Sequence, residues 1–236
     1  MSGGAVPAWT PQGPPRVPGA PAVRPKHAAT LIVVRRDGPK PRVLMGRRNA
    51  GHGFMPNLWV FPGGRIDRSD YRAPAAAELR ADVAATFERR LRPGLGRALA
   101  LAAVRETYEE AGLLLARPVS PRPGVGPWRD FLAQGAAADL DAMEIVARAI
   151  TPPQVSRRFD TWFLTADAER LTSLERRPDC GELEDIAWLE FDETRDLPLP
   201  GVTRLMIAEA AARLEDPGRP RLFLRRGPGG RSTEPL

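Results

Sequence analysis

Cysteine, histidine and lysine are all scarce in this 236-residue chain. Cys180 is the one cysteine, so the chain can form neither an intrachain disulfide nor a zinc site built from cysteines. Two histidines leave few nitrogen ligands for zinc of any other kind. A domain held together by disulfides or by zinc is therefore excluded, and the cysteine content fits a reducing compartment.

Long hydrophobic runs are also missing. No stretch approaches the roughly 18 consecutive apolar residues of a membrane-spanning helix. Residues 1–27 lack the apolar run of a secretory signal and contain seven prolines instead. We therefore expect no membrane association and no export, and we predict a cytoplasmic protein. The 42% hydrophobic and 27% charged composition is typical of a globular domain.

Positive charge is concentrated at the two ends of the chain. The net charge is +6, of which residues 1–27 carry +3 and residues 217–236 carry +4, leaving −1 for residues 28–216. A nucleic-acid-binding domain would place its positive charge on the folded part. The charge distribution therefore does not favour nucleic acid as a partner.

Composition divides the chain into three segments. Residues 1–27 are rich in proline and glycine and predict a disordered arm. Residues 225–236 similarly predict a disordered basic tail. We expect residues 28–224 to form one folded domain.

Within that domain, hydrophobic patterns and turn residues predict a mixture of strands and helices. Strands are expected at residues 29–34, 42–45, 58–61, 113–115, 159–165 and 185–191. Helices are expected at residues 74–92, 97–111, 139–149 and 203–214. The elements do not alternate regularly, which indicates an α+β fold, an α/β/α sandwich around a mixed sheet.

The predicted helix at residues 97–111 has one apolar and one acidic side. Glu106, Glu109 and Glu110 lie within about one turn, opposite an apolar stripe, and Gly112 is placed to cap the helix end. A divalent cation would relieve the mutual repulsion of these carboxylates. Oxygen ligands suit Mg²⁺ first, with Mn²⁺ as the substitute. The alternative is an ordinary solvated acidic face.

This acidic helix contains half of a family motif. The sequence RETYEEAGL at residues 105–113 resembles the second half of the Nudix box, which reads Arg-Glu-aliphatic-x-Glu-Glu-x-Gly-aliphatic, except at Thr107. Gly64 begins the first half, but Asp70 stands where the box has Glu. Between Asp70 and Arg105 lie 34 residues instead of seven, an insertion of 27 residues. The resemblance implies a Nudix-type fold with a helical insertion, within residues 71–104, inside the box.

An interrupted box is similar to that of the Nudix branch containing the peroxisomal coenzyme A diphosphatases. The likeness includes residues 52–56 and 61–64 before the box. It extends to residues 158–161 and to the acidic strand around Trp188. Together these segments cover most of residues 28–215.

The resemblance implies roles for particular residues. Glu106, Glu109 and Glu110 would bind the metal. The expected catalytic residues are Glu109, Glu106, Arg105 and a loop acid, Glu182, with Glu184 as the alternative. Expected substrate contacts are Arg158, Arg157, Gly63, Gly64, His52 and Phe54. For the two arginines the alternative is an ordinary surface position, and for the loop acids an ordinary solvated loop.

The expected function is metal-assisted hydrolysis of the diphosphate bond in a nucleoside diphosphate linked to another group. Coenzyme A or acyl-coenzyme A is favoured, with ADP-ribose or dinucleotides next. Hydrolysis of nucleoside triphosphates is an alternative reaction. A non-catalytic, nucleotide-binding regulatory module is the alternative from another class. The partner expected is thus a small nucleotide, and the sequence also allows a homodimer.

Overall fold

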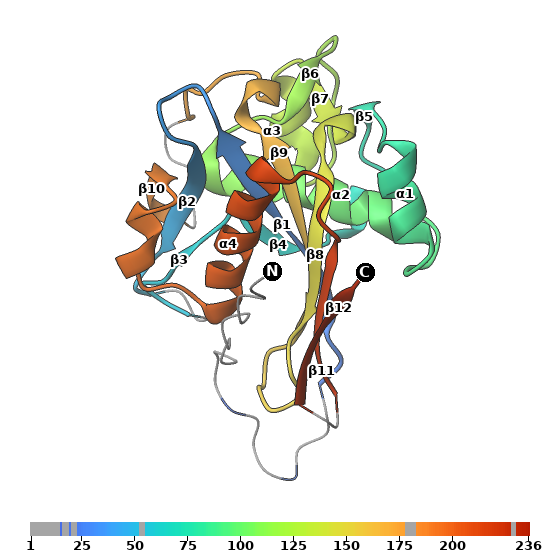
Figure 1. The fold of residues 1–236 in the computed structure, drawn as a ribbon. Helices are drawn as coiled ribbons and strands as arrows, with labels where there is room; N and C mark the ends of the chain where they lie inside the picture. Colours follow the sequence, from blue (N-terminus) through green and yellow to red (C-terminus); the bar gives the residue numbers. More distant parts are fainter. Residues whose placement is uncertain (1–14, 16–18, 20–22, 52–54, 178–182, 228–229) are drawn as a thin grey trace.

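The computed structural model describes residues 15, 19, 23–51, 55–177, 183–227 and 230–236, and Figure 1 shows their arrangement. The strands are β1 (Lys26–Arg35), β2 (Arg42–Arg48), β3 (Trp59–Val60), β4 (Gly63–Arg65), β5 (Ala75–Ala77), β6 (Ala116–Pro118), β7 (Ala136–Asp139), β8 (Glu144–Ile150), β9 (Phe159–Asp167), β10 (Leu183–Glu190), β11 (Leu222–Gly227) and β12 (Gly230–Pro235). The α-helices are α1 (Ala81–Glu88), α2 (Leu95–Ala111), α3 (Trp128–Ala133) and α4 (Gly201–Glu215). Short 3₁₀ helices are η1 (Arg68–Tyr71), η2 (Leu140–Ala142), η3 (Ala168–Arg170) and η4 (Glu193–Asp196).

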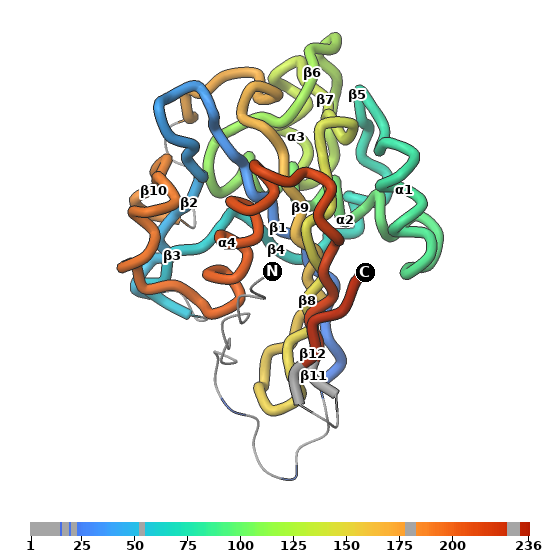
Figure 2. Tube along the Cα trace, viewed as in Figure 1, coloured from blue at the N-terminus to red at the C-terminus, as the bar shows by residue number. Residues whose placement is uncertain are grey.

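The main sheet is mixed, as expected. Its strand order is β10-β2-β1-β9-β8-β11-β12, with β3 paired to β2 and β4 paired to β1. Strand β1 pairs with β9 in parallel and with β2 and β4 antiparallel. In Figure 2 the blue trace of β1 and the trace of β9, far apart in sequence, run side by side. A second, small sheet has the order β5-β7-β6.

Helices cover both faces of the main sheet. Successive side chains of a strand point to opposite faces. On β1, Leu31 and Val33 belong to the core cluster that contains α2, whereas Ile32 and Val34 belong to the cluster that contains α4. Burial on both faces explains why this strand reads as a continuous apolar run. The α+β class and the α/β/α sandwich predicted from the sequence are confirmed (Figure 1).

Most of the predicted elements are present. The strand pair at residues 29–34 and 42–45 corresponds to β1 and β2, and the acidic helix corresponds to α2. Helix α1 occupies part of the predicted helix at residues 74–92, which begins as strand β5 instead. The strand expected at residues 113–115 starts later, as β6. Among the described helices, none combines the length and apolar character needed to cross a membrane.

The helix predicted at residues 139–149 is wrong. These residues form the end of β7, the 3₁₀ turn η2 and most of β8. Strand β8 lies between β9 and β11 and hydrogen-bonds to both. The alanine and acidic residues of this segment suit a helix locally, but the two neighbouring strands satisfy its backbone in an extended form.

The ends of the domain also differ from the prediction. The described residues of the predicted tail, 225–227 and 230–236, are not disordered, because residues 225–227 of β11 pair antiparallel with residues 230–232 of β12. Residues 222–224 of β11 join this hairpin in parallel to the edge of β8. An exposed sheet edge accepts a strand through backbone hydrogen bonds whatever its composition. The ion pair of Arg225 with Glu234, 3.1 Å between Nη2 and Oε1, joins the two hairpin strands. At the other end, β1 begins at Lys26, two residues before the predicted domain start, and nearly all of the predicted arm lies outside the described residues.

The packing of the hairpin against the core can be tested with Leu224→Ala. The Leu224 side chain is 1% exposed and belongs to the α4-side core cluster. Removing it should lower the free energy of unfolding by about 2–5 kcal/mol, measured by urea denaturation. Val125→Ala is the control, because Val125 is 80% exposed and its loss should cost less than about 0.5 kcal/mol. Equal, small effects of both changes would show that the hairpin does not pack as described.

Candidate active site

Helix α2 is largely buried, and its acidic residues lie at its C-terminal end. The helix packs against β1 and β4, and its alanines allow close approach of the sheet. Gly112 ends the helix with φ of 70°, in the left-handed region that favours glycine, and its N–H bonds to the Tyr108 carbonyl at 3.0 Å. The predicted cap is therefore confirmed. The last two turns of α2, from Arg105 onward, are fixed relative to the sheet.

Arg105 is the centre of a buried ion-pair network. Its Nε and Nη2 atoms donate to the two carboxylate oxygens of Asp70 at 2.9 and 3.1 Å. Its Nη1 donates to Glu106 Oε1 at 2.8 Å and to Glu109 Oε2 at 2.7 Å. Its Nη2 also reaches the carbonyl of Arg65 at 3.0 Å. One guanidinium thus joins the two halves of the interrupted box.

Burial and ion pairing shift the pKa of the Arg105 guanidinium in opposite directions. Its side chain is 5% exposed. Burial alone would lower the pKa of Arg105, but hydrogen bonding to Asp70 and the charges of Glu106 and Glu109 outweigh it and raise the pKa above its ordinary value. Arg105 is therefore a permanent cation beside the acidic cluster.

Asp70 fills the position of the missing glutamate. It lies in η1, is completely buried, and accepts a third hydrogen bond, at 2.7 Å, from the N–H of Asp67. The indole Nε1 of Trp128 donates a fourth, at 2.9 Å. The shorter side chain reaches Arg105 because η1 brings its backbone close to α2. The sequence carried no signal for Trp128, which lies 58 residues beyond Asp70 on α3.

The three box glutamates differ in exposure. The side chains of Glu106 and Glu109 are 16% and 36% exposed. Glu110 is buried, and its Oε2 accepts the N–H of Gly63 at 2.8 Å. Burial raises the pKa of both Glu106 and Glu109, and the charge and hydrogen bonds of Arg105 counteract this only in part. The site therefore holds negative charge that its own arginine does not fully neutralise.

The Gly63-Gly64 turn is shaped by its contacts with β1 and α2. A Cβ on Gly63 would lie 2.6 Å from the Ala29 carbonyl oxygen, too close for any side chain. A Cβ on Gly64 would lie 2.4 Å from the carboxylate carbon of Glu106. Glycine at these positions lets the backbone of β4 run against the acidic end of the helix.

A hard divalent cation fits this donor set. The carboxylates of Glu106, Glu109 and Glu110 offer oxygen ligands only, which suit Mg²⁺ or Mn²⁺. Within the described ranges, no three acidic, histidine or cysteine side chains converge on one point, and Glu106 and Glu109 meet at the Arg105 guanidinium instead.

A large pocket, which we call the main pocket, has a volume of about 1690 Å³ and contains the acidic end of α2. Eight of the expected site residues line it: Gly63, Gly64, Arg105, Glu106, Glu109, Glu110, Arg157 and Arg158. The fold thus brings the two arginines before β9 to the same pocket as the box. His52, Phe54 and Glu182 lie outside the described residues.

Glu184, the alternative loop acid, does not line the main pocket. Its carboxylate accepts from Asn49 Nδ2 at 2.8 Å and lies 3.4 Å from Arg47 Nη2.

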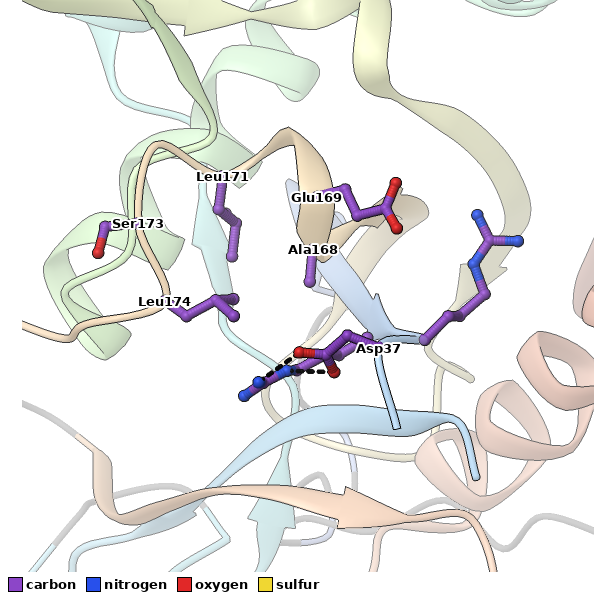
Figure 3. A pocket seen from close by; sticks show the side chains of 8 residues that line it. Asp37, Ala168, Glu169, Leu171, Ser173 and Leu174 are labelled. Atoms are coloured by element: carbon purple, nitrogen blue, oxygen red, sulfur yellow. Dashed lines mark hydrogen bonds and ion pairs between the residues drawn. The ribbon is translucent and has the colours of Figure 1, made fainter. Parts of the chain in front are cut away.

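A smaller pocket of about 220 Å³ lies elsewhere, between η3 and the turn after β1 (Figure 3). There, Arg35 and Asp37 pair with each other, as the dashed lines in Figure 3 show.

Comparisons with known proteins find similar sequences and a similar fold among Nudix hydrolases. No family model matches the chain. The chain is 36% identical over 134 residues to the acyl-coenzyme A diphosphatase NUDT19 of Gallus gallus, covering 43% of this chain and 35% of that protein. It is 29% identical over 174 residues to the human protein of the same name, covering 52% and 46%. A putative nudix hydrolase 7 of Caenorhabditis elegans is 28% identical over 186 residues, covering 72% and 53%. The chain thus spans between about a third and about half of the length of these curated relatives.

A solved structure resembles the fold over most of its length. The crystal structure of a NUDIX hydrolase from Alicyclobacillus acidocaldarius superposes with a TM-score of 0.57 at 28% identity, covering 78% of this chain and 90% of that one. In sequence and in fold, the chain is therefore similar to Nudix hydrolases. Among the curated relatives, the chain is similar in sequence to acyl-coenzyme A diphosphatases, which are enzymes.

The buried Asp70–Arg105 pair predicts a graded loss of stability. Asp70→Asn keeps the shape but leaves a buried guanidinium without its main counter-charge, which should cost about 3–5 kcal/mol. Trp128→Phe removes only one of the four donors to Asp70 and should cost about 1–2 kcal/mol. Urea denaturation of both variants shows which of the two loses more stability. A larger loss for Trp128→Phe than for Asp70→Asn would contradict the arrangement.

The box glutamates predict that metal-free protein loses stability as pH rises above about 4.5, their ordinary pKa. Burial raises the pKa of Glu106 and Glu109, so each contributes stability that is complete below the unfolded pKa and lost as pH rises through the folded pKa. Urea denaturation should be compared from about pH 4 to about pH 8 in wild type and Glu106→Gln/Glu109→Gln. The double variant should lose less stability over this interval. An identical pH dependence of the two proteins would refute the assignment.

Proposed function

We propose that this protein is a divalent-metal-dependent hydrolase of the diphosphate bond in nucleoside diphosphates linked to another group. Coenzyme A and acyl-coenzyme A are the favoured substrates, and ADP-ribose and dinucleotides come next. The observation that carries the proposal is the four-residue network of Asp70, Arg105, Glu106 and Glu109, assembled across the insertion at one end of the main pocket. The similarity to acyl-coenzyme A diphosphatases supports the choice of substrate.

Three carboxylates of α2 would hold the metal: Glu106, Glu109 and Glu110. When bound, Mg²⁺ or Mn²⁺ would neutralise charge on the phosphoryl oxygens and lower the pKa of a coordinated water. The side chains around the site would orient the metal ligands, accept a proton and contact the substrate phosphates. The bond from Gly63 N–H keeps Glu110 in a single orientation beside β4.

Arg105 acts as a positioning residue. Asp70 holds its guanidinium in two hydrogen bonds, and the guanidinium in turn fixes the carboxylates of Glu106 and Glu109. Such outer contacts hold metal ligands in the orientation that binding needs. The insertion does not interrupt this chain of contacts, because η1 and α2 are adjacent in space.

Glu109 is the best placed of the three carboxylates to accept a proton. It is the most exposed of them in its side chain and still lines the main pocket. Glu182 is a second proposal for this role, made on the family pattern alone.

The walls of the main pocket suit an anionic substrate. Arg157 and Arg158 line it together with the Gly63-Gly64 turn, where a backbone without side chains permits close approach. Arginine presents a planar fork of donors that matches phosphate oxygens. We propose that these arginines contact the phosphates of the bound nucleotide.

An activity panel tests the proposal. Purified protein with Mg²⁺ is incubated with coenzyme A, acetyl-coenzyme A, ADP-ribose, NADH, dinucleoside polyphosphates and deoxynucleoside triphosphates, and the phosphorylated products are separated. We expect cleavage of coenzyme A compounds first, and loss of activity after metal chelation. Turnover of triphosphates alone would favour the alternative reaction. No turnover of any compound by folded protein would refute a catalytic function.

Substitutions of the metal-binding face test the assigned residues. Glu109→Gln keeps the size of the side chain but removes its charge. We expect kcat/KM to fall by at least the roughly 100-fold that loss of an outer contact can cost at a metal site. Glu88→Gln is the matched control, because Glu88 is an exposed acid on α1 and should not affect turnover. Equal activity of the two variants would exclude Glu109 from the site.

A further inference from the structure

The main pocket is strongly cationic in spite of its acidic end. Nine arginine and lysine side chains line it against four carboxylates. Arg24, Lys26 and Arg158 are among the basic side chains of this pocket that form no ion pair with a carboxylate in the described ranges. Elsewhere in the described structure, buried arginines pair with acids, as Arg148 does with Asp160. Cations left without counter-charges in a pocket indicate a ligand that supplies the negative charge.

These three side chains, the strand-start cluster, come from one place in the fold. Strands β1 and β9 run parallel, and Lys26 pairs with Phe159 at their beginnings. The N–H of Lys26 donates to the carbonyl of Arg158 at 2.9 Å. Arg158 Nη1 in turn donates to the carbonyl of Val23, next to Arg24, at 2.8 Å. The cluster is therefore tied together by the backbone.

Arg158 is oriented without being neutralised. Its Nε donates to the Thr151 carbonyl at 2.9 Å, so both of its protein partners are neutral backbone oxygens. The residue is half-buried, and burial lowers the pKa of Arg158 with no acid to oppose it. An anion placed against this guanidinium would gain a charge-assisted hydrogen bond with little reorganisation.

The cluster lies apart from the metal-binding face. Thr30 of β1 pairs with Gly63, whose N–H holds Glu110. Lys26 lies four residues earlier on the same strand, about 13 Å away at the usual rise of a strand. Both the cluster and Glu106 and Glu109 line the main pocket, so one ligand bound in this pocket can contact both.

We infer that the strand-start cluster binds a second phosphate of the substrate, a phosphomonoester carried on the nucleoside away from the diphosphate. This inference rests on the proposed diphosphatase function and deepens it. A phosphomonoester carries close to two negative charges near neutral pH and offers three acceptor oxygens to the cluster. The site thus selects nucleotides that carry this extra phosphate, such as the 3′-phosphoadenosine part of coenzyme A, over their dephosphorylated forms.

Coenzyme A and dephospho-coenzyme A differ only in that phosphate and provide the test. We expect wild type to hydrolyse coenzyme A with a kcat/KM at least about tenfold higher, the effect of one charge-assisted hydrogen bond. In Lys26→Gln/Arg158→Gln this ratio should fall toward one. Arg195→Gln is the control, because Arg195 is an exposed arginine outside the main pocket and should keep the wild-type ratio. Thermal unfolding of each variant checks that it is folded.

Calorimetric binding of adenosine 3′,5′-bisphosphate and of 5′-AMP gives a second measurement that needs no turnover. Wild type should bind the bisphosphate more tightly, and the double variant should lose this preference. Equal rates on the two coenzymes in wild type, or an unchanged ratio in the folded double variant, would overturn the inference. If neither coenzyme is cleaved, the proposed preference for coenzyme A fails, and the calorimetric comparison still decides whether the cluster binds the second phosphate.

Discussion

Arg105 carries a full positive charge into the interior of the protein, with 5% of its side chain exposed. Moving such a charge out of water is costly, and only close pairing with good geometry offsets the cost. Asp70 supplies that pairing through two hydrogen bonds. Because the remaining donors of the same guanidinium hold Glu106 and Glu109, the position of the acidic face depends on whether this one pair is formed.

The insertion is accommodated because it adds structure around this pair without entering it. It contributes β5 to the small sheet and α1 to the side of α2, and its last residues become the first turns of α2 itself. Gly96 permits the contact, since a Cβ there would lie 2.4 Å from the Cβ of Phe87 on α1. The added segment extends α2 backward, so the box acids keep their places at its C-terminal end.

Local patterns predicted several elements correctly. The acidic helix, its cap at Gly112 and the two strands β1 and β2 follow from periodicity and turn residues within short stretches. The helix expected at residues 139–149 was wrong, because pairing with β9 and β11 overrides the local preference of β8. The tail at residues 225–236 was wrong for a similar reason. Its described residues are ordered by the pairing of β11 with β12, and residues 222–224 of β11 join this hairpin to β8, which the composition of the tail does not reveal.

The sequence by itself predicted the resemblance to Nudix hydrolases and the acidic face of α2, because these depend on residue types at fixed spacings along one helix. Only the tertiary structure decided that Asp70 serves as the partner of Arg105 and that Trp128 holds Asp70 in turn. It also decided that Lys26 and Arg158 lie together beside the main pocket. These contacts join residues far apart in the chain, and their geometry is set by how the sheet and helices pack, which no local pattern encodes.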